Sequence, residues 1–222
     1  SLLPTYHKTR LLNAFNECYS NPDALDLVNE FSFGAATFSY KEAKNGPKEK
    51  VDSYRKIIAI PNTVSHFHRI LALRLCDHLR ANGILDDNIQ KGCIPGIKCP
   101  LLQQIIKVKS VVNDSIKNNK KTAIMYLDIA DAFGSVNRDS LFYILRLYKV
   151  PENFISYVDN YYKGFSYYVR NKEIDVDNIT WKDGLVQGCP LSPILFITII
   201  NYVLSYMDDK YKSTVGYAFS DT

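Results

Sequence analysis

Residues 122–138 read TAIMYLDIADAFGSVNR, and the interpretation of the whole chain starts from this stretch. Its first part, Ala123 to Leu127, is a short apolar run of the kind that forms a buried strand. Asp128 interrupts the run at a point where a strand should still be packing apolar side chains. Because a buried carboxylate without a partner costs several kcal/mol, we expect a cation or a metal opposite Asp128.

Two interpretations of Asp128 are open from this stretch alone. In the first, it is a carboxylate at the end of a strand that holds a divalent metal beside a polyphosphate, with Asp131 three residues later. In the second, the stretch is a strand-to-helix turn in which Asp128 caps the helix, a position that favours Asp.

Length and composition indicate a folded protein. The chain has 222 residues, of which 46% are hydrophobic and 23% are charged, so it can bury a substantial core. No apolar run reaches the roughly 18 residues of a membrane span, and the sequence SLLPTYHK at the start lacks the pattern of a signal peptide. That start resembles the interior of a longer protein, and we expect no membrane partner.

The cysteines and histidines do not form a metal-binding pattern. The five cysteines lack paired Cys-x-x-Cys spacing, which indicates free thiols in a reducing compartment. We therefore expect an intracellular protein, in the nucleus or the cytoplasm. His66 and His68 lie close together without a Cys or an acid at ligand spacing, so a structural role is favoured over metal binding.

The net charge of +4 is unevenly distributed. Residues 41–56 carry a balance of +3 and residues 98–121 a balance of +5, which leaves −4 on the rest of the chain. Two basic segments on an otherwise acidic body favour a polyanionic partner. A solvated surface remains the alternative for either segment alone.

Hydrophobic periodicity and turn signals predict the order of the secondary structure. Helical spacing covers residues 6–31, with a break at Asn21-Pro22. Strands over 33–40 and 54–60 enclose a basic loop with a turn at 45–47, which makes a hairpin suited to closing on a phosphate. The remaining predictions are helices at 63–82, 101–118, 141–150, 154–162 and 194 to about 209, a strand at 167–170 and a turn at 175–178.

Two loops suggest contact with a polyanion. The loop at residues 90–96 places Lys91 among glycines and a proline, a composition that can follow a nucleic-acid backbone but is also common. Residues 184–193, GLVQGCPLSP, precede an apolar helix. Glycines allow a ligand to approach the backbone closely, and a helix start favours anions. This loop becomes specific only when it is paired with residues 127–133, about 55 residues upstream.

Taken together, four blocks resemble reverse transcriptases, most closely those of non-LTR retrotransposons. They are YRKI at 54–57 with the helix behind it, QKG at 90–92, residues 127–136, and QGCPLSP at 187–193 followed by Leu195 and Phe196. The resemblance covers roughly residues 35–205, and the last two blocks are its most specific part.

The resemblance implies an α+β fold, that of a right-hand polymerase with helix-rich fingers and an antiparallel palm sheet packed on helices. Residues 1–121 would form the fingers, with the basic hairpin at about 35–60 and helices at about 63–82 and 101–118. Residues 122–222 would form a palm truncated before the second catalytic aspartate pair. The implied reaction is template-directed DNA synthesis from an RNA template, with a DNA primer and deoxynucleoside triphosphates.

The resemblance also assigns roles to residues. Asp128 matches the first catalytic aspartate, which would bind two Mg²⁺ ions, or Mn²⁺ in their place, together with the backbone carbonyl of Ile129. Phe133 matches the steric gate against a ribose 2′-hydroxyl. Arg55, Lys41 and the backbone amides near Asp131 and Ala132 would bind the triphosphate. Gln187 and Gly188 would lie under the incoming nucleotide and template base. The nucleic-acid backbone would contact Lys56, Lys91 and Gly92.

The chain departs from the family pattern at two places. Gly134 stands where many relatives carry another aspartate, which is not a metal ligand in the family. Residues 206–209, YMDD, look like the second catalytic motif but begin only 19 residues after Gln187. A helix from Ile194 at 3.6 residues per turn already includes them, so we expect a solvated helix end. A strand over residues 197–203 is the minority alternative.

On this interpretation the true aspartate pair lies beyond Thr222, and these 222 residues alone lack polymerase activity. The alternative function is a catalytically inert scaffold of reverse-transcriptase type that binds RNA. An RNA-synthesising polymerase is disfavoured by the aromatic ring of Phe133, because such an enzyme usually gives the 2′-hydroxyl room.

Overall fold

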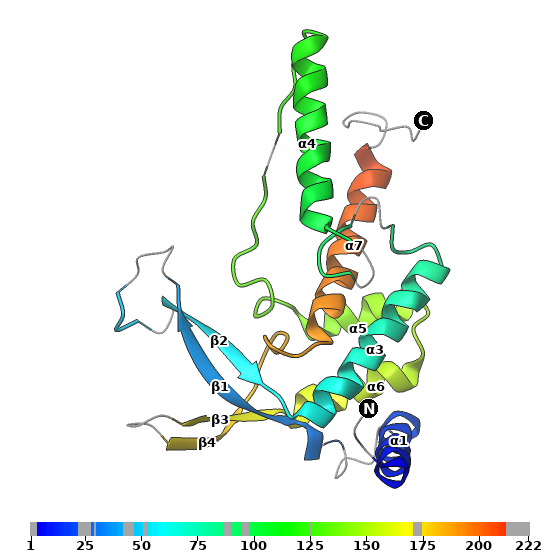
Figure 1. Cartoon of the computed structure of the whole chain (residues 1–222), viewed down its shortest axis with the longest axis vertical. Coiled ribbons are helices and arrows are strands. Elements are labelled where there is room, and N and C mark those ends of the chain that lie inside the picture. The colour runs from blue at the N-terminus through cyan, green and yellow to red at the C-terminus, as the bar shows by residue number, and fades with distance from the viewer. Residues whose placement is uncertain are drawn as a thin grey trace.

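The computed structural model describes residues 4–21, 28, 30–41, 47–50, 53–86, 90–94, 98–124, 126–170 and 175–211. Its elements are α1 (Thr5–Ser20), β1 (Phe33–Tyr40), β2 (Tyr54–Ala59), α3 (Asn62–Ala81), α4 (Pro100–Lys117), α5 (Arg138–Leu147), α6 (Glu152–Gly164), β3 (Ser166–Arg170), β4 (Asp175–Thr180) and α7 (Ser192–Tyr211). Figure 1 shows the sheet beside a group of helices, with α4 extending beyond the other elements. This arrangement confirms the α+β class.

Strands from both halves of the chain form one mixed sheet, in the order β2-β1-β3-β4. β1 and β2 are antiparallel, with Ala35 opposite Ala59 and Tyr40 opposite Tyr54, which confirms the predicted hairpin strands. β1 runs parallel to β3, and β3 is antiparallel to β4. The sheet therefore joins residues on both sides of the expected boundary at 121. An antiparallel palm sheet is not among the described strands and stays a prediction.

The predicted turn at residues 175–178 is wrong, because these residues belong to β4. Asp and Asn are rare in strands, so the sequence DVDN resembles a turn. In the fold, Arg170 of β3 donates to Asp175 (3.0 Å) and to Asp177 (3.2 Å) on the paired strand. Such cross-strand charge pairs support a hairpin that intrinsic propensity disfavours. Part of the turn signal is real, since Asn178 has a positive φ of 56° beside an irregular register.

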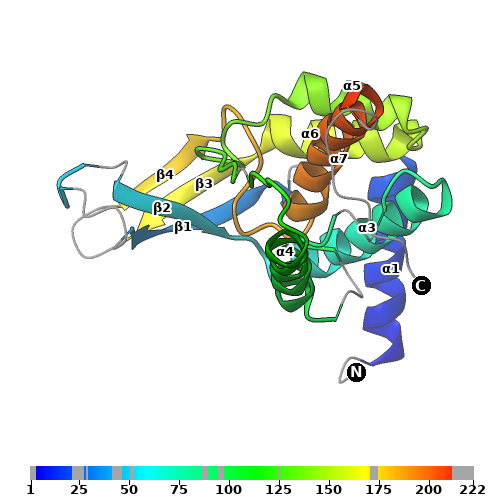
Figure 2. The ribbon, with the colours of Figure 1, turned by 90° about the horizontal axis from the view of Figure 1, so that it is seen from above.

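The core combines a majority of aliphatic side chains with a group of aromatic rings on packed helices. α7 contacts α3 and α5, and α6 contacts α1 and α5 (Figure 1 and Figure 2). Phe15 of α1 stacks on Phe67 of α3 with ring centroids 4.5 Å apart, and Phe67 meets Tyr157 of α6 edge-on at 5.2 Å. These contacts fix α3 and α6 relative to each other.

The prediction of a buried strand over Ala123 to Leu127 is wrong. Apart from Met125, which lies outside the described residues, this segment has no regular structure, and Tyr126 and Leu127 are 79% and 75% exposed. A strand needs a neighbour for its backbone N–H and C=O groups, and none of the four described strands pairs with it. Asp128 is exposed as well, so the expectation of a buried carboxylate is also wrong.

The helix predictions at the end of the chain are confirmed. Residues 206–209 lie inside α7, so the YMDD sequence is helical and the strand alternative is wrong. Asp209 is exposed, as expected for a solvated helix end. The segment 215–219, expected to lead into the true aspartate pair, lies outside the described residues. No described helix has the length and apolarity needed to cross a membrane.

We expect Phe15→Ala to lower the free energy of unfolding by about 3–5 kcal/mol, because it removes a buried ring that stacks on Phe67. Urea denaturation would measure the change. Tyr6→Ala is the matched control, since Tyr6 lies on the same helix but is 65% exposed, and its cost should stay within about 0.5 kcal/mol. Equal costs at the two positions would contradict the packing of α1 on α3.

Candidate active site

Residues 184–189, here called the Gly184–Cys189 loop, connect three of the four blocks identified from the sequence. Leu185 N donates to the carbonyl of Phe133 (2.8 Å), and Ile58 N of β2 donates to the carbonyl of Gln187 (2.7 Å). The loop is therefore bonded to the end of the 127–136 block on one side and to the edge of β2 on the other. This brings Phe133, Gln187 and Gly188 to the strand that carries Arg55 and Lys56.

Two glycines make this close approach sterically accessible. Gly188 has a φ of +118°, and a Cβ there would overlap the backbone carbonyl of Ile58. Gly184 has a φ of +74°, and a Cβ there would collide with the carbonyls of Phe133 and Gly134. Only glycine combines a positive φ with such close backbone contact.

The loop is also anchored from the core. Ser192 Oγ, at the start of α7, donates to the carbonyl of Val186 (2.8 Å), and Val186 N donates to the hydroxyl of Tyr162 (3.4 Å). Burial raises the pKa of Tyr162, so its hydroxyl stays protonated. The backbone of the loop is thus fixed on both faces, while the side chain of Gln187 is only half-buried.

His68 lies behind the loop and has the structural role that the sequence favoured. It is fully buried, with Nδ1 3.0 Å from Cys189 Sγ and Nε2 2.8 Å from Tyr157 Oη. Burial lowers the pKa of His68 to about 3, so the ring is neutral at physiological pH. His66 is exposed and lies 2.7 Å from the carbonyl of Asn62.

Phe133 is held in a tight turn next to α7. Its half-buried ring lies 5.4 Å from that of Phe196, measured between centroids. Asp131, with a φ of +47°, begins the turn, and Ser135 N donates to its carbonyl (2.8 Å). The carboxylate of Asp131 occupies the space that a Cβ of Gly134 would need. Because this carboxylate is the end of an exposed side chain, it could move aside for a larger residue at Gly134.

Successive residues of a strand point to opposite faces, and this separates Arg55 from Lys56. The Lys56 ammonium lies 4.1 Å from the ring centroid of Trp181 and 4.9 Å from that of Tyr167, as a cation–π contact. Arg55, opposite Ser39 in the register, is exposed on the other face. Lys56 therefore ties β2 to the residues that lead into the Gly184–Cys189 loop.

Most of the remaining sequence-predicted residues lie away from these contacts. Asp128 and Ile129 are exposed, and none of the described contacts joins them to the loop. Lys41 is half-buried, and its backbone N–H donates to the carbonyl of Ser53 (2.8 Å). Lys91 is 9% exposed, whereas Gly92 is exposed with open space where a Cβ would be. Ala132 is half-buried in the same turn as Phe133.

The described residues do not form a complete metal site. Within the described ranges, no group of three His, Cys, Asp or Glu side chains is placed to hold an ion. Asp128 and the carbonyl of Ile129 supply ligand atoms of the type that Mg²⁺ prefers. Two ions need more carboxylates than this one exposed side chain provides. All five cysteines are free.

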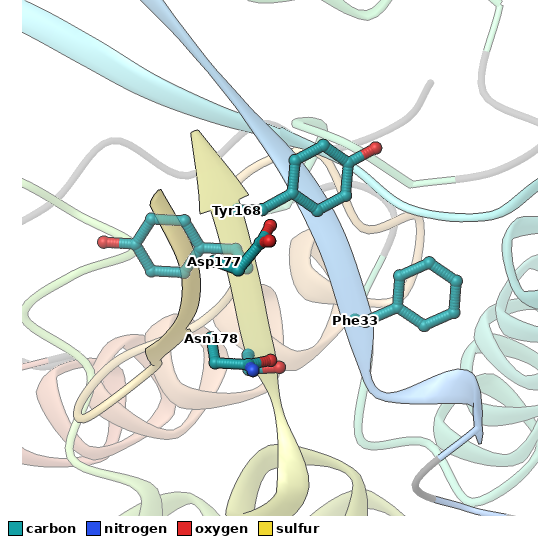
Figure 3. Close-up of a pocket in the computed structure, with 6 residues that line it drawn as sticks. Phe33, Tyr168, Asp177 and Asn178 are labelled. Carbon is teal, nitrogen blue, oxygen red and sulfur yellow. The ribbon is translucent and has the colours of Figure 1, made fainter. Parts of the chain in front are cut away.

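A hollow of about 270 Å³ lies elsewhere on the sheet, between β1, β3 and β4. Figure 3 shows Phe33, Tyr168, Asp177 and Asn178 around it. None of the sequence-predicted site residues lines this hollow, and Asp177 is already paired with Arg170. It is therefore separate from the candidate site.

The sequence favoured a structural role for His68 but did not place it, Trp181 or Tyr162 beside the Gly184–Cys189 loop. His68 falls on the buried face of α3 with Val64 and Leu71, so a polar residue in an apolar stripe was the available signal. The single Trp, at position 181 just before a glycine-rich loop, was a second signal. Tyr162 had none, because its contact with Val186 and Ser192 depends on how α6 packs against α7.

Comparisons with known proteins identify the family of this chain. A family model described as reverse transcriptase (RNA-dependent DNA polymerase) matches residues 44–221. The chain is 30% identical over 165 residues to the retrovirus-related Pol polyprotein from type-2 retrotransposable element R2DM of Drosophila melanogaster, a match that covers 74% of this chain. It is 28% identical over 170 residues to the corresponding polyprotein from type-1 retrotransposable element R2 of Nasonia vitripennis, covering 73%. The matches span 15% of the length of each relative.

We expect the stability of the fold to decrease in acid because of His68. Its pKa is about 3 when folded, against about 6.5 when unfolded. Between these values the unfolded chain binds the extra proton, so stability is lost as the pH falls below 6.5. Between pH 7 and pH 5, the free energy of unfolding of the native chain should fall by about 2 kcal/mol more than that of His68→Asn.

Urea denaturation at several pH values would measure this difference. His66→Asn is the control, because it removes an exposed histidine of the same helix and leaves the buried contacts of His68 in place. Parallel pH profiles for the native chain and His68→Asn would contradict a buried, neutral His68.

Proposed function

The chain belongs to the reverse transcriptase (RNA-dependent DNA polymerase) family, and from that premise we propose that it forms the nucleotide-binding part of an RNA-directed DNA polymerase. It is a reverse transcriptase of the non-LTR retrotransposon type. One observation carries the proposal: the Gly184–Cys189 loop is bonded to both Phe133 and β2. This convergence supports one nucleotide site in which Phe133 would be the steric gate, Gln187 and Gly188 would contact the base and the strand of Arg55 would lie alongside.

In this proposal residues 1–121 are fingers and residues 122–222 are part of a palm. The basic hairpin of β1 and β2 would close over the nucleotide from the fingers. β3 and β4 would return from the palm segment to extend the same sheet, consistent with the parallel pairing of β1 with β3. The contact of Lys56 with Trp181 supports a firm connection between the two parts.

We assign the selection of deoxynucleotides to Phe133. Its ring is backed by Phe196, and its carbonyl is bonded to Leu185, so the side chain has little freedom to move aside. A ring fixed beside the sugar excludes a 2′-hydroxyl by overlap. Gln187 and Gly188 would lie under the incoming nucleotide and template base, where a backbone fixed by Ile58 keeps the surface in one position.

We assign the polyphosphate to groups around the same locus. Arg55 and Lys41 supply cations from the hairpin, and backbone amides near Asp131 and Ala132 supply neutral donors. The RNA template and DNA primer would follow the basic segments at 41–56 and 98–121, with Lys91 and Gly92 at one bend of the backbone. The positive charge of these segments supports a polyanionic partner.

Two Mg²⁺ ions, when bound, supply activation of the primer 3′-hydroxyl and neutralisation of the triphosphate in such enzymes. Asp128 and the carbonyl of Ile129 fit one part of that coordination, but the described residues do not complete it. The sequence pattern supports our proposal that a second carboxylate pair comes from sequence beyond residue 222 and that residues 1–222 alone do not polymerise. Manganese would serve in the same positions.

The second candidate is an inert scaffold that binds RNA without catalysis. The incomplete set of carboxylates in the described part of the chain is the observation that favours it. The two candidates differ in the sequence that follows residue 222. An aromatic residue followed by x-Asp-Asp after a short strand supports the polymerase, and its loss supports the scaffold.

Primer extension on an RNA template, in a longer protein that carries this domain, tests the polymerase directly. We expect Asp128→Asn to lower kcat by about 1,000-fold or more, because it removes an ionised ligand of the catalytic ions. Asp209→Asn is the matched control, an exposed aspartate within α7, and should change kcat by less than about twofold. Equal losses at the two positions would contradict the assignment of Asp128 and of the helical YMDD sequence.

A second experiment tests the steric gate. In the same protein, Phe133→Val should raise the ratio of kcat/KM for ribonucleotides over deoxynucleotides by at least about tenfold, because it opens space at the 2′ position. Tyr143→Val, at a residue of α5 that is 61% exposed, should leave the ratio unchanged. Unaltered sugar discrimination in Phe133→Val would refute the gate.

A further inference from the structure

A buried set of polar side chains joins two core helices to the Gly184–Cys189 loop. It runs from Tyr157 of α6 through His68 of α3 to Cys189 at the end of the loop. His68 has no exposed surface and Cys189 only 3%, so neither can contact a substrate directly. Their influence on a bound nucleotide must pass through the backbone of the loop.

The hydrogen-bonding capacity of His68 is fully used. A neutral imidazole has one N–H donor and one acceptor nitrogen, and both are engaged, at 3.0 Å from the Cys189 sulfur and 2.8 Å from the Tyr157 oxygen. Burial keeps the pKa of His68 at about 3 and raises that of Cys189 to about 11, so the ring is neutral and the thiol is protonated. Loss of either partner leaves a buried polar group unsatisfied, which is costly.

The contact between His68 and Cys189 affects the loop because Cys189 directly follows Gln187 and Gly188. Gln187 is fixed from the front by Ile58 N, and Cys189 is fixed from behind by His68. Gly188 lies between the two anchors, with no room for a Cβ against the backbone of Ile58. A displacement of Cys189 therefore moves the two residues assigned to the nucleotide.

We propose that His68 is a positioning residue for the incoming nucleotide, acting through Cys189 Sγ to hold Gln187 and Gly188 against the edge of β2. This role rests on the proposed function of the loop, and it assigns to α3 a part in setting nucleotide affinity. Tyr157 completes the contact by orienting the imidazole from the side opposite the loop.

Hydrogen exchange on the 222-residue chain tests the structural half of this role without requiring activity. In Cys189→Ala the amides of residues 186–189 should exchange about tenfold faster, as expected for the loss of one buried hydrogen bond, while those of α1 remain unchanged. Cys189→Ser should restore most of the protection, because its hydroxyl can still bond to the imidazole. His68→Leu should match Cys189→Ala, and the double variant should show no further increase. A uniform rise along the chain would overturn the link.

Steady-state kinetics in the longer protein test the functional half. Cys189→Ala should raise the KM for deoxynucleotides about tenfold with kcat within twofold, and Cys189→Ser should reverse most of this change. Cys18→Ala is the matched control, since Cys18 is an equally buried cysteine on α1, and should leave KM unchanged. An unchanged KM in Cys189→Ala together with faster exchange in the loop would overturn the positioning role.

The two experiments separate failure of this inference from failure of the proposed function. If the unaltered longer protein does not extend primers, the polymerase assignment and the nucleotide-positioning role fall together. The exchange experiment then still decides whether His68 holds the Gly184–Cys189 loop.

Discussion

The contact between Gly188 and the backbone of Ile58 sets the geometry on which the site depends. Two segments separated by 130 residues approach so closely that a single Cβ would overlap a carbonyl, and Ile58 N bonds to Gln187 beside this point. The approach fixes the loop along the edge of β2, and Leu185 then fixes Phe133 through its carbonyl. Small shifts at Gly188 are therefore passed to Gln187 and, through Leu185, to Phe133. The core supplies the rigid backing for this contact, because Tyr162 and Ser192 hold the loop at Val186 from the side away from β2.

Much of this arrangement was accessible from the sequence. Helical periodicity located α3, α5, α6 and α7, because their buried faces repeat at 3.6 residues. The glycines at 184 and 188 indicated close backbone approach, and the pairing of their loop with residues 127–133 made the loop specific without identifying Phe133 as the contact. Helical periodicity and the two glycines could be recognised because each is visible within a short stretch of sequence.

The failures have a common physical origin in partners distant along the chain. Ala123 to Leu127 has the composition of a strand, but no described strand lies beside it. β4 has the composition of a turn, and Arg170 on the neighbouring strand stabilises it as a strand. The ammonium of Lys56 lies over Trp181, a contact that no local pattern could indicate, while its assignment to a nucleic-acid backbone stays a prediction.

The two outer strands of the sheet differ in how they are shielded. An edge strand presents unpaired N–H and C=O groups that can template pairing with another molecule. On β2 the backbone of Gln187 occupies part of that edge through Ile58. On β4 the exposed carboxylates of Asp175 and Asp177 and the left-handed turn at Asn178 make the ribbon charged and irregular. Both margins are therefore poor templates for strand addition, which protects an exposed mixed sheet from self-association into aggregates.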